Sequence, residues 1–163
     1  MNIRLTEMTE SLCRAYFQEF ELDPVMFLDL EKYQPYEYSE ERCYAILERY
    51  RQLGRVYMAI LLDEEPIGEI LLKKIDRTKR CATLGIHMKN DRCKNQGYGT
   101  QAEILMLKYA FETLGLDVVY ADALKQNHRS CHVLEKVGFQ EIQRDTDFVY
   151  YMCQKETWNA PNL

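Results

Sequence analysis

Two glycines between a strand pattern and a helix pattern constrain this chain more than any other feature. The segment Asp91–Leu107 reads DRCKNQGYGTQAEILML, and Gly97 and Gly99 stand directly before an apolar run that continues to about Leu114. A strand-like run, Cys81–Met88, precedes the segment. Such a junction presents free backbone N–H groups and the positive end of a helix dipole, and glycine lets a phosphate approach the main chain closely. The sequence therefore predicts an anion-binding loop, with an ordinary loop-to-helix junction as the alternative.

The composition is typical of a soluble globular protein, and its length suits a single domain over residues 1–163. Hydrophobic residues make up 47% of the chain and charged residues 29%. No apolar run approaches the ~18–20 residues that span a bilayer, and the amino terminus lacks the apolar core of a secretory signal. The net charge of −5 disfavours a nucleic-acid partner, which needs a basic surface. We therefore expect a cytoplasmic protein with no nucleic-acid and no membrane partner.

The six cysteines are scattered through the chain and form no CxxC pair. Three of them, Cys13, Cys81 and Cys131, fall where we expect buried faces. Reduced thiols are therefore expected, rather than disulfides or a zinc site.

Hydrophobic periodicity and turn residues predict an α+β order of elements. In its amino-terminal part the pattern predicts, in chain order, a short strand, a helix, a short helix and a second longer helix: Ile3–Leu5, Glu10–Phe20, a helix opened by Asp23-Pro24, and Ser39 to about Leu53. Thr9, Asp23 and Ser39 are the expected caps of the three helices. From Arg55 the pattern predicts strands interrupted by two helices: Val56–Leu62, Ile67–Lys73, Cys81–Met88, the long helix after Gly99, Val118–Leu124, Asn127–Val137, Phe139–Arg144 and Phe148–Cys153.

Three stretches within residues 55–153 resemble the GNAT superfamily of acyl-CoA-dependent N-acyltransferases: LGIHMKNDRCKNQGYGTQA, VVYADAL and NHRSCHVLEKVGF. In the first, Lys94 stands where the phosphate loop of the family usually has Gln or Arg. The third matches the family's NxxSxxxLEKxGF segment through Asn127, Ser130 and Leu134. The resemblance implies the GNAT fold: an α+β domain with a mixed, mostly antiparallel central sheet of six to seven strands, splayed fourth and fifth strands, and flanking helices.

Two positions depart from the pattern of many relatives. A tyrosine that protonates the departing CoA thiolate often stands at the position of Leu134. Without it, the chain is similar to the branch that contains ribosomal-protein N-terminal acetyltransferases (RimJ- and RimL-like) and small-amine acetyltransferases, in which a serine at the position of Ser130 is the proposed acid. That branch often carries a glutamate in its fourth strand, where this chain has Thr83. The resemblance therefore leaves the general base unassigned.

The resemblance implies acetyl-CoA as cosubstrate and no metal. Its pyrophosphate would lie on the amides of Gln96–Thr100, and its pantetheine arm between Cys81–Met88 and Val118–Leu124. An amine would attack the thioester directly, and a backbone N–H near Met88 would stabilise the oxyanion. Because many relatives dimerise, a homodimer is also implied as an option. The cofactor-binding residues by this resemblance are Ile86, His87, Met88, Lys94, Asn95, Gln96, Gly97, Tyr98, Gly99, Thr100, Asn127 and Ser130.

An alkylamine with a pKa near ~10.4 is almost wholly protonated at pH 7, so a base or a water relay is expected. His87 suits this role because an imidazole titrates near pH ~6.5; a half-buried strand histidine is the alternative. Glu69 shares a predicted strand face with Ile67 and Leu71, which favours a role at the cleft; a solvent-facing residue on an edge strand is the alternative. Asp122 is a third candidate base.

Other candidates have structural explanations of their own. Asn127 is a natural cap whose side chain would accept the N–H of Ser130, so capping competes with a catalytic explanation. The stretch Tyr33–Tyr44, with its acidic residues Glu37, Glu40 and Glu41, would attract an ammonium group at the acceptor site, or would be a solvated helix start. In the last strand, Tyr150 and Tyr151 alternate, so one is expected to face the acceptor and the other the core.

The sequence thus predicts an acetyl-CoA-dependent N-acetyltransferase acting on a primary amine, with Ser130, His87 and Glu69 as catalytic candidates. The amine would be a peptide or protein N-terminus or a small molecule. A non-catalytic CoA-binding sensor of the same fold is the alternative, since the usual tyrosine and glutamate are absent. A Rossmann-type dinucleotide binder is disfavoured, because Ala102 occupies the last glycine position of that motif and no acidic ribose ligand follows.

Overall fold

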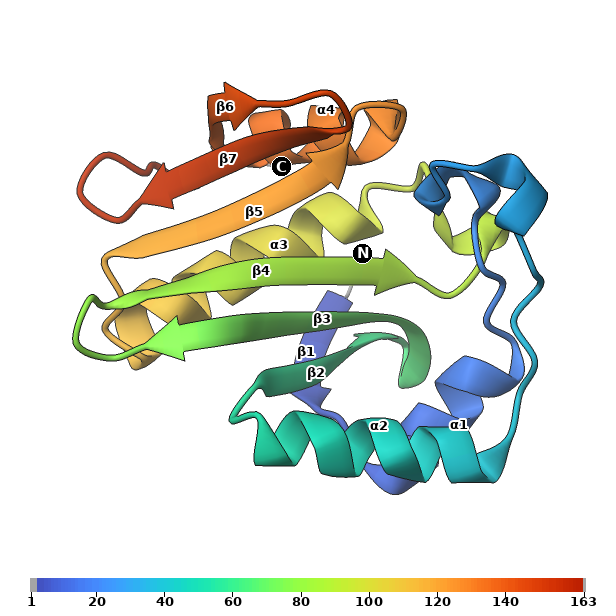
Figure 1. The fold of residues 1–163 in the computed structure, drawn as a ribbon. Helices are drawn as coiled ribbons and strands as arrows, with labels where there is room; N and C mark the ends of the chain where they lie inside the picture. The colour runs from blue at the N-terminus through green and yellow to red at the C-terminus, as the bar shows by residue number, and fades with distance from the viewer. Residues whose placement is uncertain (1–2, 163) are drawn as a thin grey trace.

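The computed structural model describes residues 3–162, in which seven strands form one twisted sheet (Figure 1). The strand order is β1-β2-β3-β4-β5-β7-β6, and every neighbouring pair is antiparallel except β4 and β5. The predicted α+β class and the mostly antiparallel mixed sheet are confirmed. The strands are β1 Ile3–Glu7, β2 Val56–Leu62, β3 Glu65–Asp76, β4 Cys81–Met88, β5 Val118–Leu124, β6 Gln140–Arg144 and β7 Phe148–Gln154.

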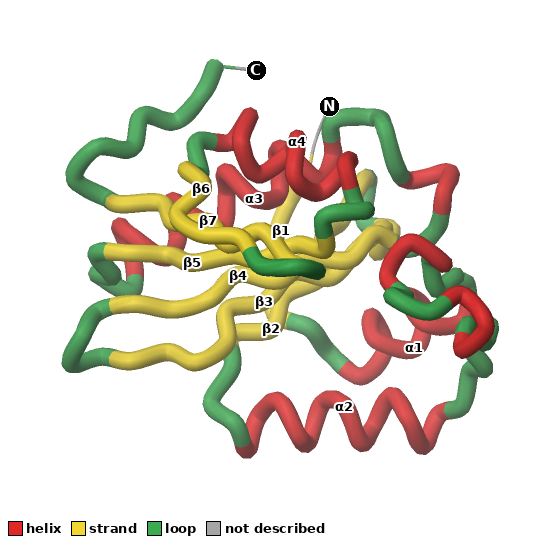
Figure 2. Tube along the Cα trace, turned by 45° about the horizontal axis from the view of Figure 1, so that its top comes forward, coloured by secondary structure: helices red, strands yellow, loops and turns green. Residues whose placement is uncertain are grey.

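Helices cover both faces of the sheet, α1 and α2 on one face and α3 and α4 on the other (Figure 2). They are α1 Glu10–Gln18, α2 Glu40–Gln52, α3 Tyr98–Lys108 and α4 His128–Val137. Thr9, Ser39 and Asn127 accept backbone N–H groups at the starts of α1, α2 and α4, so these three predicted caps are confirmed.

Two predicted helices differ from the structure. Asp23-Pro24 opens only a single 3₁₀ turn, Pro24–Met26, because the chain returns to extended backbone at Phe27. The long helix after Gly99 ends as an α-helix at Lys108 and continues as a π-helical turn, Tyr109–Thr113.

The two faces of the sheet enclose cores of different size. The larger core lies against α3 and α4 and includes Leu72, Leu84 and Met106. The smaller core lies under α1 and α2 and includes Tyr16 and Tyr57. Because side chains of a strand alternate between the faces, buried neighbours such as Leu71 and Leu72 belong to different cores.

The parallel strands β4 and β5 separate along their length. They pair over three residues only, Cys81–Thr83 against Val118–Tyr120. On its other edge, β4 pairs with β3 as far as Met88, and β5 pairs with β7 along its whole length. The predicted splay is therefore confirmed, and the second half of β4 has one edge without a strand partner in the described part of the chain.

Candidate active site

The glycine loop joins the splayed end of β4 to the start of α3. Gly97 has a φ of +82°, a conformation that favours glycine, and it caps α3 without a side-chain hydrogen bond. A Cβ added to Gly99 would lie 3.9 Å from Met88 Sδ and 4.0 Å from Ile86 Cδ1, so Gly99 faces the end of β4. The first N–H groups of a helix have no partner within it, and these are available to an anion.

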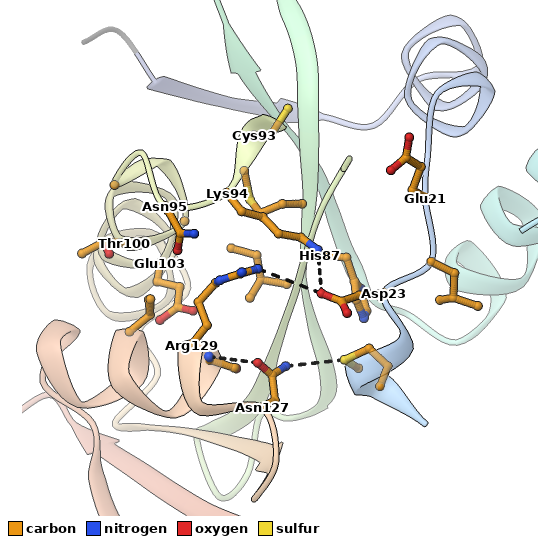
Figure 3. A pocket seen from close by; sticks show the side chains of 18 of the residues that line it. Glu21, Asp23, His87, Cys93, Lys94, Asn95, Thr100, Glu103, Asn127 and Arg129 are labelled. Atoms are coloured by element: carbon orange, nitrogen blue, oxygen red, sulfur yellow. Dashed lines mark hydrogen bonds and ion pairs between the residues drawn. The ribbon is translucent and has the colours of Figure 1, made fainter. Parts of the chain in front are cut away.

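A pocket opens between this loop, the end of β4, the start of α4 and the segment 20–26 (Figure 3). A second pocket lies between the splayed halves of β4 and β5. The two pockets have six lining residues in common, so they meet: Met26, Ile86, His87, Glu103, Asn127 and Ser130. Together they form a path from the glycine loop into the gap between the strands.

Most of the residues that the resemblance assigned to the cofactor are brought together here. The first pocket is lined by Ile86, His87, Met88, Lys94, Asn95, Gly97, Gly99, Thr100, Asn127 and Ser130. Gln96 and Tyr98 are not among its lining residues; Tyr98 is half-buried and packs against the larger core.

Asp23 lies between the glycine loop and α4, and the sequence had indicated it only as a cap. It accepts the Val25 N–H at 3.0 Å as that cap, and its Oδ2 accepts a hydrogen bond of 2.7 Å from Lys94 Nζ. Arg129 Nη1 approaches the same oxygen to 4.0 Å (Figure 3). Partial burial raises the pKa of Asp23, but the hydrogen bonds from Lys94 and Val25 outweigh burial and hold that pKa below its ordinary value. The ammonium group of Lys94 is therefore engaged by carboxylates, since it also donates a hydrogen bond of 3.0 Å to Asp91 Oδ1.

Glu69 is enclosed in the sheet. Its strand β3 lies between β2 and β4, and the residue is 7% exposed, so the alternative of a solvent-facing edge residue is wrong. Tyr57 Oη donates a hydrogen bond to Glu69 Oε2, and His87 Nδ1 lies 3.3 Å from Glu69 Oε1. Burial, followed by the Glu69 carboxylate, raises the pKa of Tyr57, so this phenol stays protonated and donates its O–H to the carboxylate. The three side chains form a chain across adjacent strands, under α1 and α2.

The prediction that Glu69 shares a strand face with Ile67 and Leu71 is correct for Leu71 only. Leu71 packs in the smaller core, which also contains Tyr57, the hydrogen-bond partner of Glu69. Ile67 packs in the larger core, on the other face of the sheet. A bulge in the β2–β3 pairing, between Ile60 and Leu61, shifts the register near Ile67 and reverses the alternation there.

The remaining candidates occupy distinct places. Asn127 Oδ1 accepts the Ser130 N–H at 3.2 Å, which confirms capping, and both residues also line the pockets. Asp122 is exposed and lines the second pocket only.

The two alternating tyrosines of the last strand have different surroundings. Tyr151 is 1% exposed in the larger core, as one of the pair was expected to be. Tyr150 Oη donates a hydrogen bond of 2.8 Å to Asp145 Oδ2.

Part of the tyrosine-rich stretch is also internal. Tyr36 and Tyr38 pack against the smaller core, whereas Tyr44 is exposed. The Tyr36 ring stacks on Phe17 of α1, with 5.4 Å between the ring centroids. Glu40 and Glu41 stand in the first turn of α2, where acidic residues suit the helix dipole.

Glu103, which lines both pockets from α3, was not among the predicted site residues. Its side chain is 1% exposed, and its Oε2 has no hydrogen-bond partner within residues 3–162. Burial alone raises the pKa of Glu103 to about 8. The available signal was a single acidic residue inside the otherwise apolar run Ala102–Leu107.

Within residues 3–162, the six cysteines are free and no cluster of three or more metal-ligating side chains is found. Cys13 is buried as expected, but Cys81 and Cys131 are only half-buried. None of the described helices has the length and apolar character to cross a membrane.

An open strand edge beside a glycine-capped helix, within a sheet of this order, is the arrangement expected for acetyl-CoA-dependent acyltransferases of the GNAT fold. A family model described as an acetyltransferase (GNAT) domain matches residues 2–140, and the chain belongs to this family.

Individual relatives agree with that assignment. The chain is 32% identical over 118 residues to the acetyltransferase PseH of Campylobacter jejuni, covering 72% of this chain and 71% of PseH. It is 29% identical over 122 residues to YdaF of Bacillus subtilis, whose name assigns it provisionally as a ribosomal N-acetyltransferase; that match covers 69% of this chain and 66% of YdaF.

Among solved structures, the fold is similar to a spermidine N-acetyltransferase from Vibrio cholerae in complex with CoA and spermine. The TM-score is 0.78 at 17% identity, covering 94% of this chain and 96% of the other. The crystal structure of Campylobacter jejuni PseH gives a TM-score of 0.70 at 20% identity, covering 94% and 98%. The chain is thus an N-acetyltransferase with acetyl-CoA as its cosubstrate, and the alternative of a non-catalytic sensor is not favoured.

Proposed function

We propose that this enzyme acetylates a primary amine that reaches the cleft from the α1/α2 face, with His87 as the base, Glu69 as its positioning partner and Ser130 as the proton donor to the leaving thiolate. The observation that carries the proposal is the His87–Glu69 pair, with 3.3 Å between Nδ1 and Oε1, at the end of β4 where both pockets meet.

The cofactor would follow the path formed by the two pockets. Its pyrophosphate would bind the N–H groups of Gln96–Thr100, because an anion there meets the helix dipole and unpaired donors together. The pantetheine arm would bond the free edge of β4 at Ile86, His87 and Met88 in the manner of an added strand. The N–H near Met88 would then face the thioester oxygen as negative charge develops on it.

The base must take a proton from an ammonium group before attack. If Nδ1 of His87 carries its proton toward Glu69, the lone pair of Nε2 is free to accept the proton of the amine. Glu69 is fixed for this task by the hydrogen bond from Tyr57, and its enclosure strengthens the interaction with an imidazolium. The His87 side chain is 41% exposed, so an amine can reach it.

The departing CoA thiolate, by contrast, must gain a proton. The proton that Ser130 gives to the CoA sulfur would be replaced from solvent or from the protonated base. The position of Ser130 suits this role, because it lines both pockets from the first turn of α4, where Asn127 accepts its backbone N–H.

Small amines and peptide N-termini are the two classes of acceptor that fit the proposal. The spermine complex of the Vibrio cholerae neighbour and the name of YdaF each represent one option. Release of CoA thiol from acetyl-CoA, measured over polyamines, aminoglycosides, amino sugars, amino acids and short peptides, tests the proposal. Turnover confined to one amine class supports it and names the substrate, whereas turnover that is unchanged in a His87→Ala variant contradicts the role of His87.

A further inference from the structure

A carboxylic acid is buried where the two pockets meet. Glu103 lies four residues after Gly99 on α3, and Figure 3 shows its side chain in the wall of the first pocket. It lines the second pocket as well, and Ile86 and Ser130 line both. Buried polar atoms are normally paired, because an unpaired one costs stability. Oε2 of Glu103 has no partner among the described residues, so a hydrogen-bonding group is left unused at this point.

The surroundings of Glu103 favour its neutral form. Enclosure raises the pKa of its carboxyl to about 8, and no described residue forms an ion pair with it. At neutral pH the carboxyl therefore carries a proton and offers an O–H donor. The titratable and charged side chains that face the same pockets come from every neighbouring element: Lys73 of β3, His87 of β4, Cys93 and Lys94 of the loop, Asp122 of β5, Arg129 of α4, and Glu21, Asp23, Asp29 and Lys32 of the segment before α2.

We propose that Glu103, as a neutral carboxylic acid, donates a hydrogen bond to an amide carbonyl of the pantetheine arm of bound acetyl-CoA. This inference rests on the proposed position of the cofactor. An α-helix has about 3.6 residues per turn, so Glu103 lies on the same helix face as Gly99, about one turn deeper. A cofactor whose pyrophosphate lies on the first turn of α3, and whose arm follows the free edge of β4 at Ile86, would pass beside Glu103, because Glu103 and Ile86 line the same two pockets.

The donor must be neutral for this contact. The amide carbonyls of pantetheine accept hydrogen bonds and carry no charge, so a protonated carboxyl pairs with them. An ionised carboxylate has no proton to donate and would be shielded from water by the cofactor. Affinity for the cofactor should therefore be constant below about pH 8 and fall by up to tenfold per pH unit above it, because the protein must then take up a proton on binding.

The test is calorimetric binding of desulfo-CoA, an analogue without a thiol that ionises, to the full chain between pH 6 and pH 9.5. Wild-type affinity should fall through the upper part of this range. Glu103→Gln keeps a donor and nearly the same shape, so its affinity at pH 7 should remain within about threefold of wild type and stay level to high pH. Glu103→Leu lacks the donor and should bind about five- to tenfold more weakly at pH 7. Glu112→Gln, an exposed change on the turn after α3, is the matched control and should keep the wild-type pH profile.

Two results would overturn the inference: wild-type affinity that is level to pH 9.5, or affinity of Glu103→Gln that falls as steeply as wild type. If the wild-type protein binds no CoA compound at any pH, the proposed cofactor site fails instead, so the two failures are distinguishable.

Thermal unfolding without ligand tests the protonation state of Glu103 independently and requires only the Gln variant. The folded chain holds the Glu103 proton more tightly than the unfolded chain, whose ordinary pKa is 4.5. The stability that this group contributes is therefore complete below pH 4.5 and is lost as the pH rises toward about 8. Between pH 5 and pH 8 the Tm of Glu103→Gln should fall less than that of wild type, and equal slopes would contradict a buried neutral acid.

Discussion

The two faces of the sheet present their functional groups in different ways. On the α3/α4 side, the groups proposed to hold acetyl-CoA are mainly backbone groups, the amides of the glycine loop and the free edge of β4. On the α1/α2 side they are side chains: Glu69 accepts a hydrogen bond from Tyr57, and His87 Nδ1 lies 3.3 Å from its other carboxylate oxygen. Backbone sites depend on glycine positions and helix starts, whereas side-chain sites depend on the register between strands. The cofactor side should therefore be disrupted by changes of shape and the acceptor side by changes of charge.

The largest effect is expected from Gly99→Asp. A side chain at this position would point toward Ile86 and Met88 across the pocket and would add a negative charge beside the phosphates. Affinity for CoA should fall at least about 100-fold by calorimetry, which is roughly 2.7 kcal/mol. Gly99 does not have a positive φ, so Tm should change little, unlike a change at Gly97 with its φ of +82°.

A matched control for Gly99→Asp is Gly54→Asn, remote from both pockets at a φ of +67° that asparagine tolerates. It should leave CoA affinity unchanged. Wild-type affinity in Gly99→Asp would contradict the position of the cofactor on this loop.

The acceptor side should respond to His87→Ala with a loss of about 10² in kcat/KM or more, since general-base catalysis contributes on that scale. Affinity for CoA should fall far less, because the strand backbone that would contact the cofactor is retained. Added imidazole should restore part of the activity.

Glu69→Gln should lower kcat/KM by about tenfold, because the imidazolium formed by proton transfer loses its carboxylate partner, while CoA affinity stays within about threefold of wild type. Tyr57→Phe, which removes the donor to Glu69 but keeps the ring, is the companion variant and should lower kcat/KM by less, because the carboxylate is retained. If Glu69 acts through His87, adding Glu69→Gln to His87→Ala should have little further effect. An equal loss in both backgrounds would leave Glu69 a purely structural role.

Ser130→Ala changes a residue that both pockets share, so it could affect either cofactor binding or catalysis. Proton donation to the thiolate predicts a drop in kcat of about tenfold or more with CoA affinity within about threefold of wild type. Equal losses in kcat and in affinity would reduce Ser130 to a cofactor contact. The cap remains in this variant, since Asn127 bonds the backbone N–H of residue 130.

The same contrast explains what could be predicted from the sequence. The bounds of β4 and β5 and the caps at Thr9, Ser39 and Asn127 follow from local patterns, and the structure has them as predicted. The splayed sheet followed from family resemblance, since nothing local in β4 or β5 indicates where their pairing ends. That the chain folds as a single domain, and that it forms a homodimer, both stay predictions.

Side-chain partners across strands could not be predicted in the same way. The contact between Glu69 and His87 requires the β3–β4 register, in which these two residues are directly opposite. The opposite orientation of Ile67 results from a bulge that no local motif marks. Glu103 stood in an apolar helix pattern, but its buried oxygen could be recognised only when the walls of both pockets were known.

The smallest expected effect concerns Asp23, which the sequence had indicated only as a cap. Asp23 lies beside two cations that line the first pocket, accepting a bond of 2.7 Å from Lys94 and lying 4.0 Å from Arg129. A carboxylate at the entrance of a site for phosphates repels them and engages the lysine that would otherwise attract them. Asp23→Asn keeps an oxygen for the Val25 N–H and removes the charge, so CoA affinity should rise about three- to tenfold at low salt and less at high salt.

Asp91→Asn is the matched control for Asp23, because Asp91 also bonds Lys94, at 3.0 Å, but its side chain is 82% exposed and screened by solvent. Its effect on affinity should be less than about twofold. Weaker binding in Asp23→Asn would reverse the interpretation, because the carboxylate would then hold Lys94 in position for the cofactor.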